Sequence, residues 1–368
     1  KTTLARKIHN PNADMPTEDE TTEGIVIQPY EFSLSNGKTF RLNIWDFGGQ
    51  EIYHNTHQFF LTKRSLYALV ADTRRNDTEF YWWLNTVELL SDNSPVFVLK
   101  NQKDDRTPQL DEPALRERFD NLKDFHACNL GTNENLDKLI HYIQFNAEAL
   151  PHIGDTLPKT WVKVREALEH DTCNTISQDT YLQLCTDNGF TRRSDALQLS
   201  DYLHDLGVFL HFQDDPVLKH TVILNTQWGT DAVYKILDDK QVQGGQHGCF
   251  NKTDDIQRIW QADEYQGLHD ELLQLMKNFE LCYDLPEANH YIAPQLLPKQ
   301  RPDDLHWNNQ DNLILRYVYK FMPKGILNRL VVRLHKLIEA DRRRVWKHGV
   351  VLSDETAETR AKLEEKIA

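Results

Sequence analysis

The side chains with the clearest chemistry follow a predicted strand, residues 40–45, in the run 46–50, which reads DFGGQ. A carboxylate at a strand end suits Mg²⁺, because this ion prefers hard oxygen ligands and retained waters. Gly49 has no Cβ, so its backbone N–H can approach a phosphate closely. Gln50 can orient a water molecule for in-line attack on a γ-phosphate. The run therefore predicts a nucleotide site, with Asp46 near the metal and Gln50 in the catalytic step.

Two segments that precede this run fit the same site. Lys1 and Thr2 read as the end of a phosphate-binding loop, G-x-x-x-x-G-K-[ST], whose lysine reaches the β- and γ-phosphates and whose hydroxyl ligates Mg²⁺. The glycines of such a loop are expected before Lys1. Thr22 lies in a Thr-x-Gly turn before a predicted strand, where its hydroxyl suits a second place on the metal. Each segment alone is also compatible with an ordinary helix start or an acidic turn, and it is their order along the chain that favours the site.

A base-recognition motif follows a buried-type strand, residues 95–101, which ends in Asn101-Gln102-Lys103-Asp104. The carboxylate of Asp104 can accept hydrogen bonds from the ring N–H and the exocyclic amine of guanine. Asn101 and Lys103 are expected to complete this contact. The motif therefore favours guanine over adenine.

Two further positions complete the predicted site. Ala127 and Cys128 end the predicted strand 123–128, where a second loop against the base is expected. Arg74 follows the predicted strand 65–72 in a loop on the nucleotide side. An arginine supplied across a dimer can neutralise charge that develops on a transferring phosphoryl group. The alternative for Arg74 is an exposed loop side chain without a catalytic role.

Strands and helices alternate through the first 150 residues, which predicts an α/β fold with a mostly parallel sheet covered on both faces. Ligands of such sheets bind at the carboxyl ends of the strands, where the motifs above lie. The predicted strands cover about residues 25–33, 39–46, 65–72, 95–101 and 123–128, and the predicted helices about residues 2–8, 55–62, 77–91, 112–121 and 134–149.

A linker composition at residues 151–158 places a domain boundary there, and a second part follows over residues 151–310. Three predicted helices (158–169, 177–187 and 193–206) and two predicted strands (207–212 and 221–224) form a winged-helix pattern. A DNA-binding role is the alternative for this pattern. The third helix carries three aspartates and two arginines, and the whole chain has a net charge of −14. Contact with protein is therefore favoured over contact with nucleic acid.

The last part, residues 311–368, has a predicted strand at 313–321 and a basic amphipathic helix at 326–338. We expect this helix to pack on its own sheet with its charges solvated, and attachment to a membrane surface is the alternative. A strand ends at Leu352, and helix-forming residues follow from Glu355 onward. Two strands and a helix are rarely stable alone. We therefore expect this part to be incomplete near Asp354.

Composition excludes several classes of protein. With 368 residues, 39% of them apolar and 27% charged, the chain can form two or three globular domains. No apolar run approaches the roughly 18–20 residues of a membrane-spanning helix, and no signal peptide is visible. The five cysteines are odd in number and have no metal-ligand spacing, which indicates the reducing cytoplasm.

The run 46–61, with its Tyr-His-x-Thr-His-Gln-Phe-Phe sequence, resembles the switch region of Roco proteins. Residues 222–228, 322–329 and 346–352 resemble the COR region of the same family. The resemblance covers nearly the whole chain and is strongest to bacterial Roco proteins. It implies a Ras-like P-loop GTPase domain (Roc), followed by an α+β COR domain with a winged-helix-like part and a terminal αβ part. It also implies Mg²⁺, GTP as substrate, GDP as product, a role in signalling, and a homodimer formed through COR and coupled to the nucleotide state.

The chain departs from the family pattern at the base. Gln102 stands where lysine is usual, and Lys103 comes one place later. Ala127-Cys128-Asn129 stands where Ser-Ala-Lys is common. These departures weaken the supporting contacts to guanine and leave Asp104 in place. Three alternatives remain open, namely a nucleotide-binding scaffold with negligible hydrolysis, an ATPase, and a winged-helix nucleic-acid binder.

Overall fold

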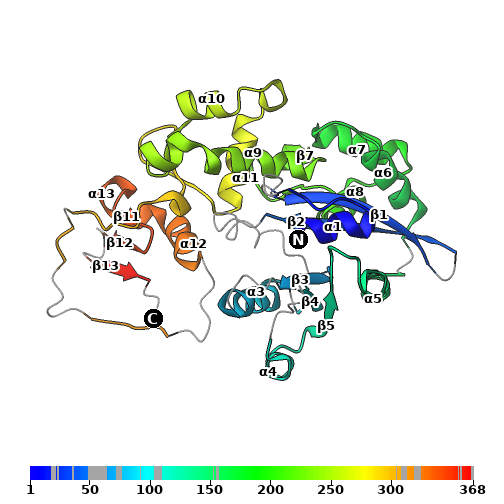
Figure 1. Cartoon of the computed structure of the whole chain (residues 1–368). Coiled ribbons are helices and arrows are strands. Elements are labelled where there is room, and N and C mark those ends of the chain that lie inside the picture. Colours follow the sequence, from blue (N-terminus) through cyan, green and yellow to red (C-terminus); the bar gives the residue numbers. More distant parts are fainter. Residues whose placement is uncertain are drawn as a thin grey trace. The chain divides into compact units, whose positions relative to one another are not determined.

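A computed structural model describes most of the chain, and the order of its helices and strands is drawn in Figure 1. Backbone packing divides the chain into two compact units, which we call unit 1 (residues 1–214 with 219–228) and unit 2 (residues 215–218 with 229–368). The described residues are 1–17, 22, 25–34, 37–48, 64–71, 77–91, 93–102, 110–151, 153–154, 157–303, 305–307, 313–318, 325–354, 356 and 359–365.

The first part of unit 1 contains a β-hairpin and a parallel sheet. Strands β1 and β2 pair antiparallel without a register break, from Ile25 opposite Phe47 to Ser33 opposite Thr39. Pro29 lacks an N–H, which suits β1 to an edge. Strands β3, β4 and β5 are parallel and lie side by side in that order. The elements are α1 (Thr2–His9), β1 (Ile25–Ser33), β2 (Thr39–Phe47), β3 (Tyr67–Ala71), α3 (Asp77–Leu90), β4 (Val96–Asn101), α4 (Glu112–Arg118), β5 (Leu122–Cys128) and α5 (Leu136–Glu148).

Strand β4 shows why this part folds as a covered sheet. Phe97 and Leu99 pack in one hydrophobic cluster with residues of α1 and α5. Val96 and Val98 pack in a second cluster with residues of α3 and α4. Because successive side chains point to opposite faces of a strand, β4 is buried on both sides, as parallel strands usually are. The predicted α/β class is confirmed, and the predicted strand bounds differ from the observed ones by two residues at most.

The second part of unit 1 contains three helices and one short ribbon. Ser177 caps α7, its hydroxyl accepting the Thr180 N–H at 3.0 Å. The core of this part includes the fully buried Tyr181 and Phe209. The elements are α6 (Lys159–Glu169), β6 (Thr175–Ser177), α7 (Gln178–Asp187), α8 (Arg193–Asp205), the 3-10 turn Leu218–His220 and β7 (Thr221–Ile223).

Of the two predicted strands 207–212 and 221–224, only the second is observed as a strand, over Thr221–Ile223. β7 pairs antiparallel with β6, which the sequence analysis did not predict. Only Leu210 bridges to β7, through two backbone hydrogen bonds of 2.9 Å with Ile223. The backbone donors of this segment are bonded to α8 instead of to a strand. The Val208 N–H donates to the Leu203 carbonyl at 3.0 Å, and the His211 N–H donates to His204 Nδ1 at 3.2 Å.

Unit 2 contains two three-stranded antiparallel sheets, ordered β8-β10-β9 and β11-β12-β13. Tyr283 and Ile292 of the first sheet share one hydrophobic cluster with Val331 and Val350, which joins the two sheets through α12. The elements are α9 (Thr226–Asp238, which begins in unit 1), the π-helical turns Gln241–Gly245 and Lys252–Ile256, β8 (Cys249–Asn251), α10 (Gln257–Ile259), the 3-10 turn Asp263–Tyr265, α11 (His269–Asn278), β9 (Tyr283–Asp284), β10 (His290–Ile292), the 3-10 turns Pro294–Leu296 and His335–Leu337, α12 (Ile326–Arg333), α13 (Glu339–Arg342), β11 (Val345–Trp346), β12 (Gly349–Asp354) and β13 (Thr359–Glu364).

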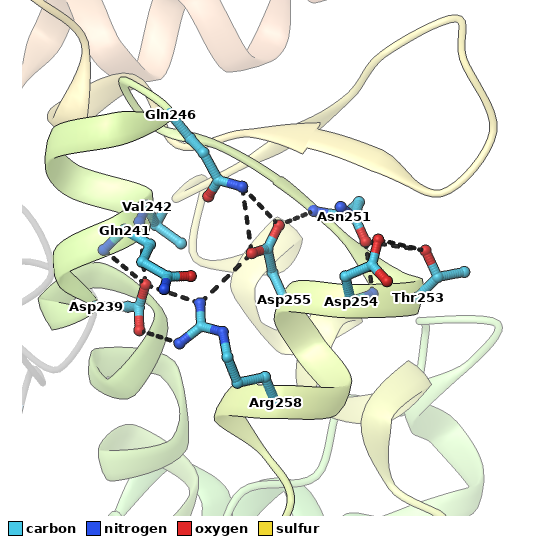
Figure 2. Close-up of polar contacts among 9 residues, drawn as sticks. All are labelled: Asp239, Gln241, Val242, Gln246, Asn251, Thr253, Asp254, Asp255 and Arg258. Carbon is cyan, nitrogen blue, oxygen red and sulfur yellow. Dashed lines mark hydrogen bonds and ion pairs between the residues drawn. The ribbon is translucent and has the colours of Figure 1, made fainter.

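A polar network within unit 2 ties its two π-helical turns to α10, as Figure 2 shows. Arg258 donates to both carboxylate oxygens of Asp239, at 2.6 and 3.0 Å. It also reaches Asp255, whose buried carboxylate accepts the Asn251 N–H at 2.9 Å. The hydrogen bond from Arg258 holds the pKa of Asp239 below its usual value. Every charge in this network has an opposite charge or a donor against it, which is what a structural network needs.

Two predictions for the C-terminal part of unit 2 are wrong. Residues 359–364, predicted as helix, form β13, which pairs with β12 from Gly349 opposite Glu364 to Asp354 opposite Thr359. Tertiary pairing thus overrides helix propensity. β13 gives β12 a second partner strand, and the expectation that this part is incomplete near Asp354 stays a prediction. α12 packs on the sheets of unit 2 through Leu327 and Val331, while Arg329 and Arg333, whose side chains are 33% and 64% exposed, pair with Glu280. Residues 313–318, within the predicted strand 313–321, are exposed and have no regular secondary structure.

Two histidines of unit 1, the buried His211 and the half-buried His204, predict a loss of stability in acid. Burial lowers the pKa of His211 and of His204. The unfolded chain therefore takes up these protons first as the pH falls below about 6.5, and the free energy of unfolding decreases. We expect wild-type stability in urea to fall between pH 7.5 and pH 5. His211→Gln should be less stable at pH 7.5 but should lose less over that interval.

His170→Gln, at an exposed histidine in the turn after α6, controls for the loss of a histidine as such. Equal changes of the pH slope in both variants would show that burial of His211 is not the cause.

Candidate functional site

Three oxygen-bearing side chains meet where α1 begins and β2 ends. The Thr2 hydroxyl donates to Asp46 Oδ2 at 2.6 Å, and the Thr22 hydroxyl donates to the same oxygen at 2.8 Å. The two hydroxyl oxygens lie 2.6 Å apart. Lys1 Nζ, at the start of α1, donates to the Gly48 carbonyl at 3.1 Å. The structure therefore brings together four residues that the sequence analysis assigned to one site.

The strand and the helix position these groups for reasons visible in the sequence. Leu42 and Ile44 alternate with their neighbours along β2 and pack into the cluster that contains Leu4 and Ile8 of α1. Asp46 continues the same alternation and so lies on the face of β2 that is directed toward α1. Its side chain is 7% exposed. A buried carboxylate of this kind needs donors or a cation, and the two threonines supply donors.

The chemistry of this oxygen cluster fits a hard divalent cation. A carboxylate and two hydroxyls are the ligand types that Mg²⁺ accepts, and nitrogen and sulfur are absent from the group. One carboxylate alone binds Mg²⁺ weakly, so the remaining places would fall to waters and phosphate oxygens. In the residues that the structure describes, no set of three or more His, Cys, Asp or Glu side chains could hold a metal on its own.

The two predicted base loops lie next to each other. β4 and β5 are parallel neighbours, with Asn101 opposite Cys128. The Gln102 N–H donates to the Cys128 carbonyl at 2.9 Å. Asn101 Oδ1 accepts the Leu130 N–H at 3.3 Å, which fixes the side chain of Asn101 against the second loop. Sequence positions 101 and 128 are thus joined at one edge of the sheet, as the motif interpretation requires.

Cys128 contributes differently from what its place in the loop suggests. Its side chain is fully buried in the cluster shared by α1, β4 and α5. Burial raises the pKa of its thiol to about 11. The neighbouring Ala127 is half-buried. A ligand at this loop would therefore meet backbone and Ala127 before it met the thiol.

Five predicted site residues lie outside the described residues, and their assignments stay predictions. They are Gly49 and Gln50 of the DFGGQ run, Arg74, and Lys103 and Asp104 of the base motif. The predicted helix 55–62 also lies there.

Lys7 was missed by the sequence analysis. It lies on the apolar side of α1, is 4% exposed, and donates from Nζ to the Pro11 carbonyl at 3.0 Å and to Asn133 Oδ1 at 2.8 Å. These bonds tie the helix that follows the phosphate motif to the loop that follows β5. A lysine between the apolar Leu4 and Ile8 was the available signal, because a charge on a buried helix face needs partners.

A cavity of about 450 Å³ borders the oxygen cluster. Lys1 and Asp46 are among its lining residues, but most of the lining is apolar and comes from α1, β2 and β3. A triphosphate would have to leave water for apolar walls there, which is unfavourable. The polar groups at the start of α1 remain the better candidates for phosphate binding.

Comparison with known proteins accounts for three ranges of the chain. The domain described as "Ras of Complex, Roc, domain of DAPkinase" matches residues 1–104. The domains described as "C-terminal of Roc, COR-A" and "C-terminal of Roc, COR-B" match residues 158–297 and 310–367. No helix within the described ranges is long and apolar enough to cross a membrane.

Similar proteins carry the same arrangement. The Methanosarcina barkeri Roco2 RocCORdC structure bound to GDP is 31% identical, with a TM-score of 0.69, and the match covers 81% of this chain and 92% of that one. A Roc-COR-CHAT protease of Runella zeae is 28% identical over all of this chain and 41% of its own length. A probable serine/threonine-protein kinase of Dictyostelium discoideum, pats1, is 26% identical over 90% of this chain. The chain spans only 12% of that kinase.

The burial of Cys128 gives a test of its place in the site. Cys173 is exposed, whereas the thiol of Cys128 is buried and has a pKa of about 11. A pKa of about 11 in place of the ordinary thiol value of 9.0 reduces the thiolate fraction about a hundredfold at neutral pH. The hydrogen bond with Asp171 raises the pKa of Cys173 too, so exposure is the main reason to expect faster labelling there. With iodoacetamide at pH 7.5 we expect Cys173 to be alkylated and Cys128 to stay unmodified until urea is added. Peptide mass spectrometry measures both, and equal labelling rates in the native protein would contradict the buried position.

Proposed function

Because the chain belongs to the Roco family, we propose that its Roc GTPase domain hydrolyses GTP to GDP and phosphate as a molecular switch. We further propose that this activity is coupled to homodimerisation through the COR region. The observation that carries the proposal is the oxygen cluster of Thr2, Thr22 and Asp46 beside Lys1. The GDP bound to the Methanosarcina relative supports a guanine nucleotide as the ligand.

Each residue of the cluster has a role in this proposal. Lys1 exchanges its hydrogen bond to the Gly48 carbonyl for the β- and γ-phosphates. The hydroxyls of Thr2 and Thr22 turn their lone pairs to Mg²⁺, and Asp46 holds the water shell of the ion. When bound, Mg²⁺ neutralises charge on the β- and γ-phosphate oxygens.

The catalytic step rests on residues outside the described ranges. Gly49 donates its N–H to the γ-phosphate, and Gln50 orients the attacking water. Arg74 of the partner protomer neutralises charge on the phosphoryl group as the bond to the leaving oxygen breaks. At the base, Asp104 accepts from guanine with support from Lys103 and Asn101. Ala127 and Cys128 form the second loop.

The proposal assigns three parts to the chain. Residues 1–150 form the Roc domain, residues 151–310 the winged-helix-like part of COR, and residues 311–368 its C-terminal part, with the homodimer formed through COR. The matched ranges 1–104, 158–297 and 310–367 are compatible with these bounds. The proposed location is the cytoplasm, without binding to nucleic acid or attachment to a membrane.

A scaffold that binds nucleotide with negligible hydrolysis is the second candidate. It would use the same Lys1, Thr2 and Asp104 and would not depend on Gln50. The departures at Gln102 and at 127–129 concern the base and do not separate the two candidates.

Guanine specificity predicts the effect of Asp104→Asn. The amide keeps one acceptor oxygen but presents an NH₂ donor to the second N–H group of guanine. A hydrogen bond to a charged group contributes about 1.5–3 kcal/mol. We therefore expect GDP affinity to fall roughly 10- to 100-fold. Xanthosine diphosphate, whose 2-oxo group can accept from the new amide, should bind the variant better than GDP does. Isothermal titration measures both affinities.

Asp105→Asn removes the same charge one residue later and should leave GDP affinity unchanged. Equal losses in the two variants would mean that net charge, rather than base recognition, sets the affinity.

Hydrolysis is tested in a version of the protein that carries a glycine-rich phosphate loop ahead of Lys1, with ATP as the control substrate. The GTPase rate per protomer should rise with protein concentration. Gln50→Leu should lower the rate about tenfold or more while GDP binding persists. An unchanged rate in Gln50→Leu, or no turnover in the wild type, would favour the scaffold.

Mixing variants tests whether Arg74 acts across the dimer. Arg74→Ala lacks the arginine but keeps Gln50, and Gln50→Leu lacks the glutamine but keeps Arg74. In a 1:1 mixture half of the dimers are mixed, each with one complete site, so roughly a quarter of the wild-type rate should return. Arg75→Ala is the matched control and should keep the wild-type rate. A mixture no more active than its components would remove Arg74 from catalysis in trans.

A further inference from the structure

Strand β2 carries the Asp46 carboxylate on one face and, on the other, a set of contacts that the proposed reaction does not use. Arg41 and Trp45 are four residues apart and therefore lie on the same face of the strand. Both contact the α6–α8 part of unit 1. Arg41 Nη1 lies 2.6 Å from Glu169 Oε2, and Glu169 also accepts from Arg165 at 2.7 Å.

The contact at Trp45 leaves no space for a side chain. A Cβ added to Gly207 would lie 2.7 Å from Cζ2 and 3.3 Å from Cη2 of the Trp45 indole. Gly207 lies just after the C-terminal end of α8. Its N–H donates to the His204 carbonyl at 2.9 Å, and its φ is +66°. Glycine is favoured here twice, by its backbone conformation and by the close approach of the ring.

A second ring contact joins α8 to Arg64, shortly before β3. The Arg64 guanidinium lies 5.3 Å from the centre of the Tyr202 ring, on α8. The same helix thus contacts β2 through the turn at Gly207 and the segment before β3 through Tyr202.

Trp45 and Asp46 are consecutive, so a displacement of the indole moves the backbone that carries the carboxylate. Asp46 Oδ2 accepts hydrogen bonds of 2.6 and 2.8 Å, which weaken steeply when the atoms separate. We propose that Trp45 and Gly207 are positioning residues, through which the α6–α8 part of unit 1 sets the Mg²⁺ affinity of the nucleotide site. This inference rests on the proposed nucleotide function and adds to it a route of regulation.

The coupling is reciprocal. If the packing of Gly207 on Trp45 changes the affinity for Mg²⁺ and nucleotide, then binding of Mg²⁺ and nucleotide changes that packing by the same free energy. The α6–α8 part of unit 1 therefore responds to the binding of Mg²⁺ and nucleotide through β2, without contacting the ligand.

Gly207→Ala tests the proposal, with GDP dissociation measured as a function of Mg²⁺ concentration. Displacing Asp46 should raise the Mg²⁺ concentration needed for half-maximal retention of GDP by about tenfold, the effect of weakening one hydrogen bond to a charged group. GDP affinity in excess EDTA should stay near the wild-type value, because only the metal-dependent part is affected. A general loss of structure would change both.

Gly189→Ala is the matched control. Gly189 also has a positive φ, +95°, but a Cβ there would meet only Thr160 Cγ2 at an ordinary 3.6 Å. It should reproduce the backbone strain of Gly207→Ala without the change in Mg²⁺ dependence. Equal shifts in both variants would assign the effect to strain alone and overturn the proposal.

Trp45→Phe replaces the indole that faces Gly207 with a smaller ring. Alone it should also raise the Mg²⁺ requirement, and it tests the link even if Gly207→Ala does not fold. Combined with Gly207→Ala, it makes room for the new methyl group and should bring the Mg²⁺ requirement back toward that of the wild type. Additive shifts in the double variant would show that the two residues act separately.

The wild type separates this proposal from the function on which it rests. If wild-type protein with a restored phosphate loop binds no GDP in Mg²⁺, the nucleotide function fails. If it binds GDP in a Mg²⁺-dependent way and Gly207→Ala leaves that dependence unchanged, only the link between Trp45 and Gly207 fails.

Discussion

The buried carboxylate of Asp46 is the constraint on which the described part of the Roc domain depends. A carboxylate that is 7% exposed must be matched by donors or a cation, and here two threonine hydroxyls share one of its oxygens. The hydroxyls come from residues 2 and 22, and the carboxylate from the end of β2. The apolar side chains of α1 and β2 pack against each other, and this packing brings the three groups together.

Burial of the sheet on both faces provides the rigidity that such a meeting requires. β4 contributes alternately to two separate hydrophobic clusters, so it is held from both sides. Its end at Asn101 is joined to the loop after β5 by two hydrogen bonds, one from the Gln102 backbone and one to the Asn101 side chain. Lys7 links the same loop to α1. The groups that we propose to bind phosphate, at the start of α1, and those that we propose to bind the base, at the ends of β4 and β5, are thus held by the same sheet and helices.

The sequence predicted those elements whose local pattern and tertiary packing agree. β4 is a continuous apolar run and α5 is amphipathic, and both were predicted with nearly the observed bounds. Residues 359–364 were predicted as helix because glutamate, alanine and lysine, which favour helices, are frequent in this stretch. Pairing with β12 makes them a strand. Residues 207–212 were predicted as a strand, but the N–H groups of Val208 and His211 are bonded to residues of α8. Proximity of Thr2, Thr22 and Asp46 followed from motif order, whereas the contact of Trp45 with Gly207 has no local signal.

The unbroken register of the β1–β2 hairpin has a consequence for how this chain can change in length. Nine consecutive residue pairs join the two strands. Deleting or inserting one residue inside β2 would exchange its two faces, turning the carboxylate outward and an aromatic ring toward the phosphate side. A change of two residues would restore the faces but shift the carboxylate along the strand by about 7 Å. The two strands of the hairpin should therefore accept substitutions more readily than changes in length.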